Sequence, residues 1–326
     1  MSNAVSCSTA SLTADNQPGS LEVHTILPMA NNFKRVRPTA MAGRFYPEDT
    51  HQCAQQISEL AESPIPGIRP DLPAKLSGAI VPHAGWVCSG SVAIHTLKTL
   101  AQRSNARTMF LTGTVHTMAM NGPTLDSADA WQTPLGDIAV DNQLRQAISL
   151  LPEVSTLDMA HQYEHSLEVV LPMISDAFGE DVKVVPCLIP PHPNAHQWGK
   201  QLGQLIQRWP HPVAVVISTD LTHYGPNYNY QPHGSGEEGR QWAFETNDQR
   251  VLDLISAMDS QQIVPEVQQY HNACGPGAIA AGMEIMRQLG STRGYLLEHT
   301  DSTAQLEPLG KADPDNSVGY AGVVFG

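Results

Sequence analysis

The sequence predicts a single α/β domain with a central mixed, mainly parallel sheet flanked by helices. Short apolar runs rich in β-branched residues alternate with amphipathic helical segments along most of the chain. The run at residues 213–217 is unbroken, as is typical of a central parallel strand. The chain shows no internal repeat and no second domain boundary, so one sheet accounts for the whole pattern.

The expected elements follow one another from residue 35 to the C-terminus. Residues 1–34 are rich in Ser, Thr, Asn and Ala, so we expect a loosely ordered extension before a domain at 35–326. Strands are expected at residues 79–81, 108–112, 182–189, 213–217, 293–299 and 319–325, with a loop or short hairpin at 120–140. Helices are expected at residues 49–62, 91–100, 141–150, from 164 onward, 195–208, 240–257, 260–269 and 276–289, with tight turns at Gly85 and Gly90 before the second of them.

Composition excludes two classes of partner. The 326 residues carry 18 Lys+Arg against 32 Asp+Glu, and the net charge of −14 disfavours nucleic acid and anionic membrane surfaces. No apolar run approaches the roughly 20 residues that a membrane span needs. Five cysteines without a CxxC pair, and no signal peptide, fit a reducing compartment, so we expect a cytoplasmic protein.

Three predicted strands end in residues that can bind metals or move protons. His83 follows the strand at 79–81, His116 follows the strand at 108–112, and Asp220 with His223 follows the strand at 213–217. Ligand-binding groups of open α/β sheets lie at the carboxyl ends of the strands. We therefore expect these side chains at one edge of the sheet.

Cys274 precedes the predicted helix at 276–289 and completes a candidate metal site. Two imidazoles and a thiolate suit iron, copper or zinc better than magnesium or calcium. With His83 and His116, Cys274 would provide three ligands and leave one coordination position open, as catalytic sites do. Asp220 and His223 could then act as general acid and base, or orient a ligand.

Each of these residues also has a structural interpretation. A single histidine in a loop is more often hydrogen-bonded than functional, a single cysteine is more often an inert buried thiol, and Asp220 could cap a turn. His165 and Glu168 are three residues apart, so they would share a helix face, either as a simple pair or as residues around the ligands. We place His271 in the same pocket. Convergence on one edge favours the metal site.

With these residues assembled, the chain resembles the MEMO family, whose bacterial and archaeal members are also called AmmeMemoRadiSam system protein B. Eight segments run in the family's order from about residue 36 to the C-terminus. They are Ala42-Gly43-Arg44-Phe45-Tyr46, Val81-Pro82-His83-Ala84-Gly85-Trp86, Gly113-Thr114-Val115-His116, Trp131-Gln132-Thr133-Pro134-Leu135, Glu164-His165-Ser166-Leu167-Glu168, Ser218-Thr219-Asp220-Leu221-Thr222-His223-Tyr224-Gly225, Tyr270-His271-Asn272-Ala273-Cys274-Gly275 and Asp315-Asn316-Ser317-Val318-Gly319-Tyr320-Ala321.

The resemblance implies a fold similar to class III, LigB-like extradiol dioxygenases, which use non-haem Fe(II). It implies that His83, His116 and Cys274 line a metal pocket for iron, or alternatively copper, with Asp220 and His223 beside it. Those dioxygenases complete their site with a carboxylate where this chain has Cys274, so ring cleavage does not follow from the fold. The system name implies a radical-SAM enzyme and an AMMECR1-like protein as partners.

Three functions remain open at this point. The first is a non-haem metalloprotein with redox or dioxygenase-like chemistry on an unknown substrate. The second is a metal-independent peptide-binding or protein-binding module built on the same fold, which is suggested by the signalling role behind the family's name. The third is metal-assisted hydrolysis with Asp220 or His223 as the base.

Overall fold

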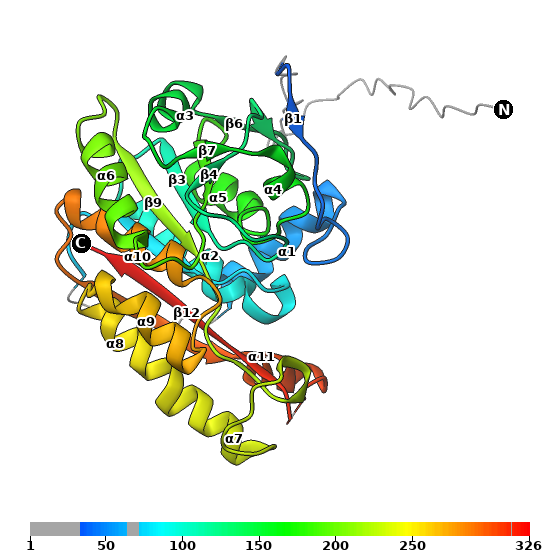
Figure 1. Cartoon of the computed structure of the whole chain (residues 1–326). Helices are drawn as coiled ribbons and strands as arrows, with labels where there is room; N and C mark the ends of the chain where they lie inside the picture. The colour runs from blue at the N-terminus through cyan, green and yellow to red at the C-terminus, as the bar shows by residue number, and fades with distance from the viewer. Residues whose placement is uncertain (1–32, 64–71, 314) are drawn as a thin grey trace, which may run out of the picture. The chain divides into compact units, whose positions relative to one another are not determined.

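The computed structural model describes residues 33–63, 72–313 and 315–326 (Figure 1). The predicted extension at residues 1–34 falls almost entirely outside this part, so that expectation stays a prediction. The described residues belong to one compact unit that runs to the C-terminus. None of the helices in the described ranges combines the length and apolar character that crossing a bilayer would require.

A mixed sheet runs through this unit, and the predicted fold class is confirmed. Four parallel strands form its centre in the order β8-β3-β9-β2. Strand β12 pairs antiparallel with β2, and β10 and β11 both pair with β12. On the other side β6, β5 and β1 extend the sheet from β8, while β4 and β7 pair beside them. The strands are β1 Val36–Arg37, β2 Gly78–Val81, β3 Thr108–Gly113, β4 Thr124–Leu125, β5 Ala130–Trp131, β6 Ile138–Val140, β7 Ser155–Thr156, β8 Lys183–Leu188, β9 Val213–Ser218, β10 His223–Tyr224, β11 Gly294–Asp301 and β12 Ser317–Phe325.

Helices cover both faces of the sheet. Side chains alternate along a strand, so Ala79 and Val81 of β2 belong to the buried cluster that includes residues of α1, α2 and α5, whereas Ile80 belongs to the cluster that includes residues of α3, α6, α8, α9 and α10. Figure 1 shows helices on both sides of the central strands. Both faces of the central strands are buried, which explains their continuous apolar runs. The helices are α1 Thr50–Glu62, α2 Trp86–Gln102, α3 Asn142–Ser149, α4 Asp158–Gln162, α5 Leu171–Phe178, α6 Ala195–Gln207, η1 Pro226–Tyr228, α7 Glu237–Trp242, η2 Ala243–Asp248, α8 Gln249–Ser256, α9 Ser260–Tyr270, α10 Pro276–Gln288, α11 Ser302–Leu306 and η3 Glu307–Leu309.

Helix α10 approaches the sheet closely because its first turns carry glycine. A Cβ atom on Gly277 would collide with the backbone carbonyl of Pro190, just beyond β8. On the side facing α6, Gly199 meets the backbone of Ala281 in the same way. These contacts hold the start of α10 against the carboxyl ends of the strands, where Cys274 lies three residues before Gly277.

The structure corrects the predicted start of two helices. The helix expected from residue 164 begins only at Leu171, because the Glu164 side chain accepts the amides of the two residues after it and the chain then forms turns over residues 166–170. The expected turn at Gly90 is also wrong. Gly90 lies inside α2, which begins at Trp86, and it makes room for the Leu60 side chain of α1.

The remaining differences lie in short elements. The segment expected to be one helix at 240–257 contains the π-helical stretch Ala243–Asp248. Residues 120–140 were expected to form a loop or a short hairpin, and a hairpin is present as the antiparallel pair β5 and β6. Strands β1 and β7 and helix α4 were not predicted, because elements of two to five residues are too short to show a period.

Candidate metal centre

The register of the central strands brings three predicted site residues to one edge. Val81 of β2 and Gly113 of β3 both pair with Ser218 of β9, so the three strands end side by side. The chain leaves each strand in the same direction. His83, His116 and Asp220 follow within three residues of those ends, and they therefore share the carboxyl edge, as the sequence predicted.

Cys274 reaches the same place from the loop before α10. Its Sγ atom lies 3.3 Å from Nε2 of His83. One ligand atom from each of His83, His116 and Cys274 can be chosen so that all lie within 4.8 Å of one another. The rings of His83 and His116 meet edge to face, with centroids 5.4 Å apart. These three predicted ligands thus form one cluster although 191 residues separate His83 from Cys274.

The tautomer of His83 follows from its neighbours. The Ser218 hydroxyl donates its only proton to the backbone carbonyl of Ser166 at 2.5 Å. Its oxygen lies 3.0 Å from Nδ1 of His83, so it must accept a hydrogen bond from Nδ1–H. Nε2 is then unprotonated and faces Cys274. The ring is also fixed through its backbone, because Oδ1 of Asp220 accepts the His83 amide at 2.8 Å.

His116 is held by Glu164. This residue belongs to one of the family-like segments but was not predicted as a site residue. One carboxylate oxygen of Glu164 accepts from Nδ1 of His116 at 2.8 Å, and the other accepts the His116 amide at 2.6 Å. Amides of His165 and Ser166 donate to the same carboxylate. Burial opposes the charge on Glu164, but these donors and His116 lower the pKa of Glu164 to about 2. Glu164 is therefore ionised, and because it holds Nδ1 of His116, Nε2 is the ring nitrogen left to face a ligand.

The Cys274 thiol is half-buried among polar groups. The backbone amide of Asp220 donates to Sγ at 3.2 Å, and Oγ1 of Thr219 lies 3.6 Å away. Burial, together with the nearby Asp220 carboxyl, raises the pKa of Cys274 to about 12. The sulfur is thus a protonated thiol at neutral pH, and a cation bound beside it would favour the thiolate.

The two predicted proton-transfer residues occupy different positions. Asp220 is buried, and its Oδ2 lies 3.9 Å from Nε2 of His83. Burial raises the pKa of Asp220, while the neighbouring His223 lowers it in part. His223 is half-buried in β10, and its Nδ1–H donates to the carbonyl of Leu221 at 3.1 Å, so its Nε2 is an available acceptor. His223 lies at the wall of the pocket and Asp220 lies beneath it.

A pocket of about 400 Å³ opens above the cluster. His116 and Cys274 line it, and so does His271, which the sequence placed here. Aromatic rings dominate the rim, where Tyr228 meets His223 edge to face with ring centroids 5.1 Å apart. The further lining residues are Asn229, Tyr230, Val267 and Ala273.

His165 and Glu168 separate in the structure instead of sharing a helix face. His165 stacks on His116 with ring centroids 4.3 Å apart and belongs to the cluster. Glu168 points away and accepts hydrogen bonds from Arg37, from Tyr46 and from the backbone amides of residues 40 and 41. The pairing fails because His165 precedes the turns at residues 166–170 and the helix begins only at Leu171, so the two side chains do not share a helix face.

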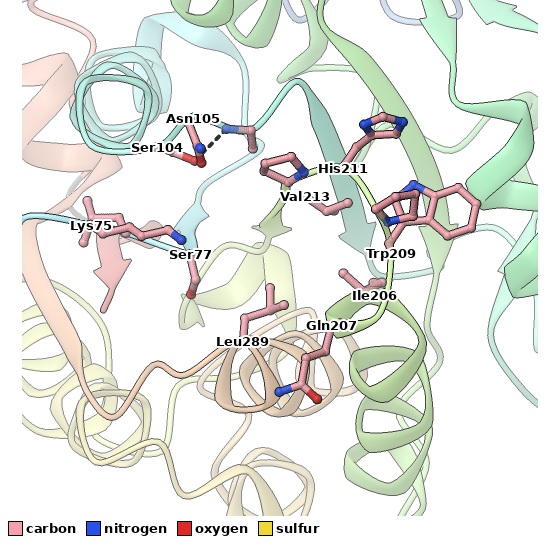
Figure 2. Close-up of a pocket in the computed structure, with 14 residues that line it drawn as sticks. Lys75, Ser77, Ser104, Asn105, Ile206, Gln207, Trp209, His211, Val213 and Leu289 are labelled. Atoms are coloured by element: carbon pink, nitrogen blue, oxygen red, sulfur yellow. Dashed lines mark hydrogen bonds between the residues drawn. The ribbon is translucent and has the colours of Figure 1, made fainter.

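A second pocket lies at the opposite edge of the sheet (Figure 2). It has a volume of about 250 Å³ and is bordered by Ser77 before β2 and by Val213 at the start of β9, at the amino ends of the parallel strands. Figure 2 shows Lys75 on one side of this pocket and Trp209 with His211 on the other. Within the described residues no group of His, Cys, Asp and Glu suited to a metal converges there.

The fold and the cluster define an α/β protein with a His/His/Cys group at the carboxyl edge of its parallel strands. Residues 37–324 match the family described as Memo-like protein, and the chain belongs to this family. The resemblance seen in the sequence is confirmed.

Relatives of known sequence cover nearly the whole chain. A MEMO1 family protein of Methanopyrus kandleri is 31% identical over 300 residues, which span 89% of this chain and 98% of that protein. A MEMO1 family protein of Methanothermobacter thermautotrophicus is 32% identical over 295 residues, spanning 88% and 99%. A solved structure of an uncharacterized Escherichia coli protein is 14% identical, with a TM-score of 0.45 over 72% of this chain and 92% of that one.

Proposed function

We propose that this protein binds one transition-metal ion through His83, His116 and Cys274 and uses it in redox chemistry on a small molecule. Iron(II) is the preferred ion and copper the second. The observation that carries the proposal is the convergence of two imidazole rings and one sulfur from three separate segments of chain. A borderline donor set of this kind suits iron or copper.

The distance between two of the donor atoms is close to the spacing that one metal ion requires. Ligands at about 2.1 Å for nitrogen and 2.3 Å for sulfur, at a tetrahedral angle, lie about 3.6 Å apart. The Sγ of Cys274 lies 3.3 Å from Nε2 of His83. Ser218 and Glu164 each hold the second ring nitrogen of a histidine, as groups around metal-bound histidines usually do. Three donors leave room for a substrate on the pocket side.

A bound iron or copper ion would supply one-electron redox chemistry and Lewis acidity at this position. The chain itself provides the surroundings. His223 offers Nε2 at the pocket wall and can accept a proton from a substrate hydroxyl, while Asp220 fixes the backbone of His83. The aromatic rim of Tyr228 and Tyr230 would exclude water from the substrate.

Metal content of anaerobically purified protein tests the proposal. We expect close to one ion per chain in the wild type, and loss of most of it in His83→Ala and in Cys274→Ser. His271→Ala is a matched control, because His271 lines the pocket but provides no atom to the cluster, so this variant should keep its metal. Wild-type protein that takes up neither iron nor copper after reconstitution would overturn the proposal.

The alternative is a pocket that binds a peptide or partner protein without metal. The aromatic rim and the 400 Å³ volume favour it, since such walls bind apolar side chains. A His83→Ala/His116→Ala double variant separates the two: unchanged affinity for a peptide ligand supports the module, and loss of affinity together with metal supports the metalloprotein. Radical-SAM and AMMECR1-like partners remain proposals to be tested by co-purification.

A further inference from the structure

A separate cavity lies beside the edge strand β1 and shares no lining residue with the pocket above the metal centre. Its volume is about 650 Å³. It is lined by residues 34–38, by residues 126–128 after β4, and by four residues of α4, and we call the part formed by Asp126 and His161 its floor. Arg37 also lines the cavity, and its guanidinium lies 4.2 Å from the ring of Trp131, whose sequence motif provides no residue to the metal centre.

Two buried acceptors on this floor lack donors. Asp126 accepts from Nε1 of Trp131 through Oδ2 at 2.7 Å, while its Oδ1 has no hydrogen-bond partner among the described residues. His161 donates from Nε2 to the carbonyl of Thr124 at 3.1 Å, so its Nδ1 is an unprotonated acceptor, and it too lacks a partner in the described part of the chain. The two residues are 2% and 1% exposed.

The electrostatics of the floor favour a donor. Burial of the Asp126 carboxyl raises its pKa to about 6, so it is mostly ionised at neutral pH. Burial lowers the pKa of His161 to about 4, so its ring is neutral there. Two of the charges that line the cavity are engaged with each other, because Ser127 links Arg35 to Asp158.

The walls are apolar and accessible. Val36 is 38% exposed and Met159 is 65% exposed, and both line the cavity. Native proteins pair nearly all buried polar atoms, so two unpartnered acceptors beneath an apolar cavity indicate a ligand that brings donors.

We propose that this cavity binds a small molecule that carries N–H donors on an apolar body, with Asp126 Oδ1 and His161 Nδ1 as the acceptors. The donor group would reach the floor, and the apolar body would lie between Val36 and Met159. Amines, amidines and primary amides share this chemistry. The site lies outside the metal centre, so binding here does not depend on a bound ion.

Three small molecules of similar shape test whether the cavity selects ligands that carry N–H donors. Benzamidine and benzamide carry N–H groups on a phenyl ring, whereas benzoate has only acceptors. We expect benzamidine to bind with a dissociation constant in the millimolar range or below, and benzamide to bind less tightly, since its donor is neutral. Benzoate should not bind. Ligand-observed NMR and calorimetry on the full chain measure all three. Equal binding of benzoate and benzamidine, or no binding of either donor, would overturn the proposal.

Asp126→Asn reverses the polarity of the floor. The Asn oxygen must take over the Trp131 donor, so the amide NH₂ would face the cavity. Benzamidine affinity should fall about tenfold or more, and benzoate should begin to bind, a gain that mere loosening of the fold would not produce. Metal content should stay at the wild-type level.

A second variant leaves the floor intact. Met159→Arg places a cation on the exposed wall, so benzamidine should bind at least severalfold more weakly. Leu150→Arg is the matched control, because Leu150 is 80% exposed and does not line the cavity. If both arginine variants changed benzamidine affinity equally, the cavity would not be its binding site.

Discussion

The Ser218 hydroxyl accepts a hydrogen bond from Nδ1 of His83 at 3.0 Å and donates a hydrogen bond to the carbonyl of Ser166. This chain sets the tautomer of His83 and turns Nε2 toward the Cys274 sulfur. Glu164 does the same for His116. The donor atoms of the proposed metal centre are thus oriented by neighbours before any ion arrives.

Ser218→Ala removes the acceptor for His83 Nδ1–H without changing a ligand. We expect metal affinity to fall about 10-fold to 100-fold, as is usual when such a supporting group is lost. Competition with a chelator measures this affinity. Ser260→Ala is the control, since Ser260 is also buried but bonds to Glu284 in another part of the fold, and its affinity should match that of the wild type. Equal affinities for both variants would refute the tautomer argument.

Glu164→Gln should weaken metal binding. It should also lower the unfolding free energy of the metal-free protein, by an amount that depends on pH. The folded pKa of Glu164 is depressed to about 2 from an ordinary value of 4.5. Its ionisation therefore stabilises the fold by about 3 kcal/mol above pH 4.5, and this contribution is lost as pH falls toward 2.

Chemical denaturation across pH checks this prediction. The difference in the free energy of unfolding between wild type and Glu164→Gln should be largest near neutral pH and should shrink below pH 4.5. Glu153→Gln, at an exposed position, should show no such trend. A difference that grows toward acid would have the wrong sign for a depressed pKa.

Metal binding should release a proton from Cys274. Burial and Asp220 raise the pKa of this thiol to about 12, so it enters the reaction protonated, whereas a metal ligand must be a thiolate. Affinity should therefore rise up to about tenfold per pH unit between pH 6 and 8. Calorimetry in two buffers of different ionisation enthalpy counts the protons. A count of zero would indicate that sulfur is not a ligand.

Arg37 supports the metal centre from a distance. It pairs with Glu168 and donates to the backbone carbonyls of His161 and Glu164. Arg37→Ala would leave the buried Glu168 carboxylate without its cation, which costs about 3–5 kcal/mol of unfolding free energy. Arg250→Ala breaks an ion pair with Glu266 in which the Arg250 side chain is 39% exposed, so it should lower the unfolding free energy by only about 1 kcal/mol or less. Denaturant titration compares the two, and equal losses would contradict this role for Arg37.

Much of the site could be predicted because strand endings leave a clear signal. Apolar runs that stop at small residues located the carboxyl edge, and the parallel register then brought His83, His116 and Asp220 together. Cys274 was found through donor chemistry and the start of α10.

The supporting residues could not be predicted in the same way. Ser218 and Glu164 act through hydrogen bonds to residues 135 and 48 positions away, and no local pattern encodes these contacts. A signal did exist for Glu164, since an acidic residue directly before His165 interrupts the helical pattern by binding nearby amides. Glu168 was misplaced because its partner Arg37 belongs to a two-residue strand that propensity does not reveal.

X-ray absorption spectroscopy of the anaerobically isolated protein tests the central claim most directly, because it identifies the atoms bound to the metal. We predict one sulfur at about 2.3 Å and two imidazole nitrogens at about 2.1 Å, with the sulfur contribution lost in any metal retained by Cys274→Ser. A metal coordinated only by nitrogen and oxygen in the wild-type protein would contradict the account.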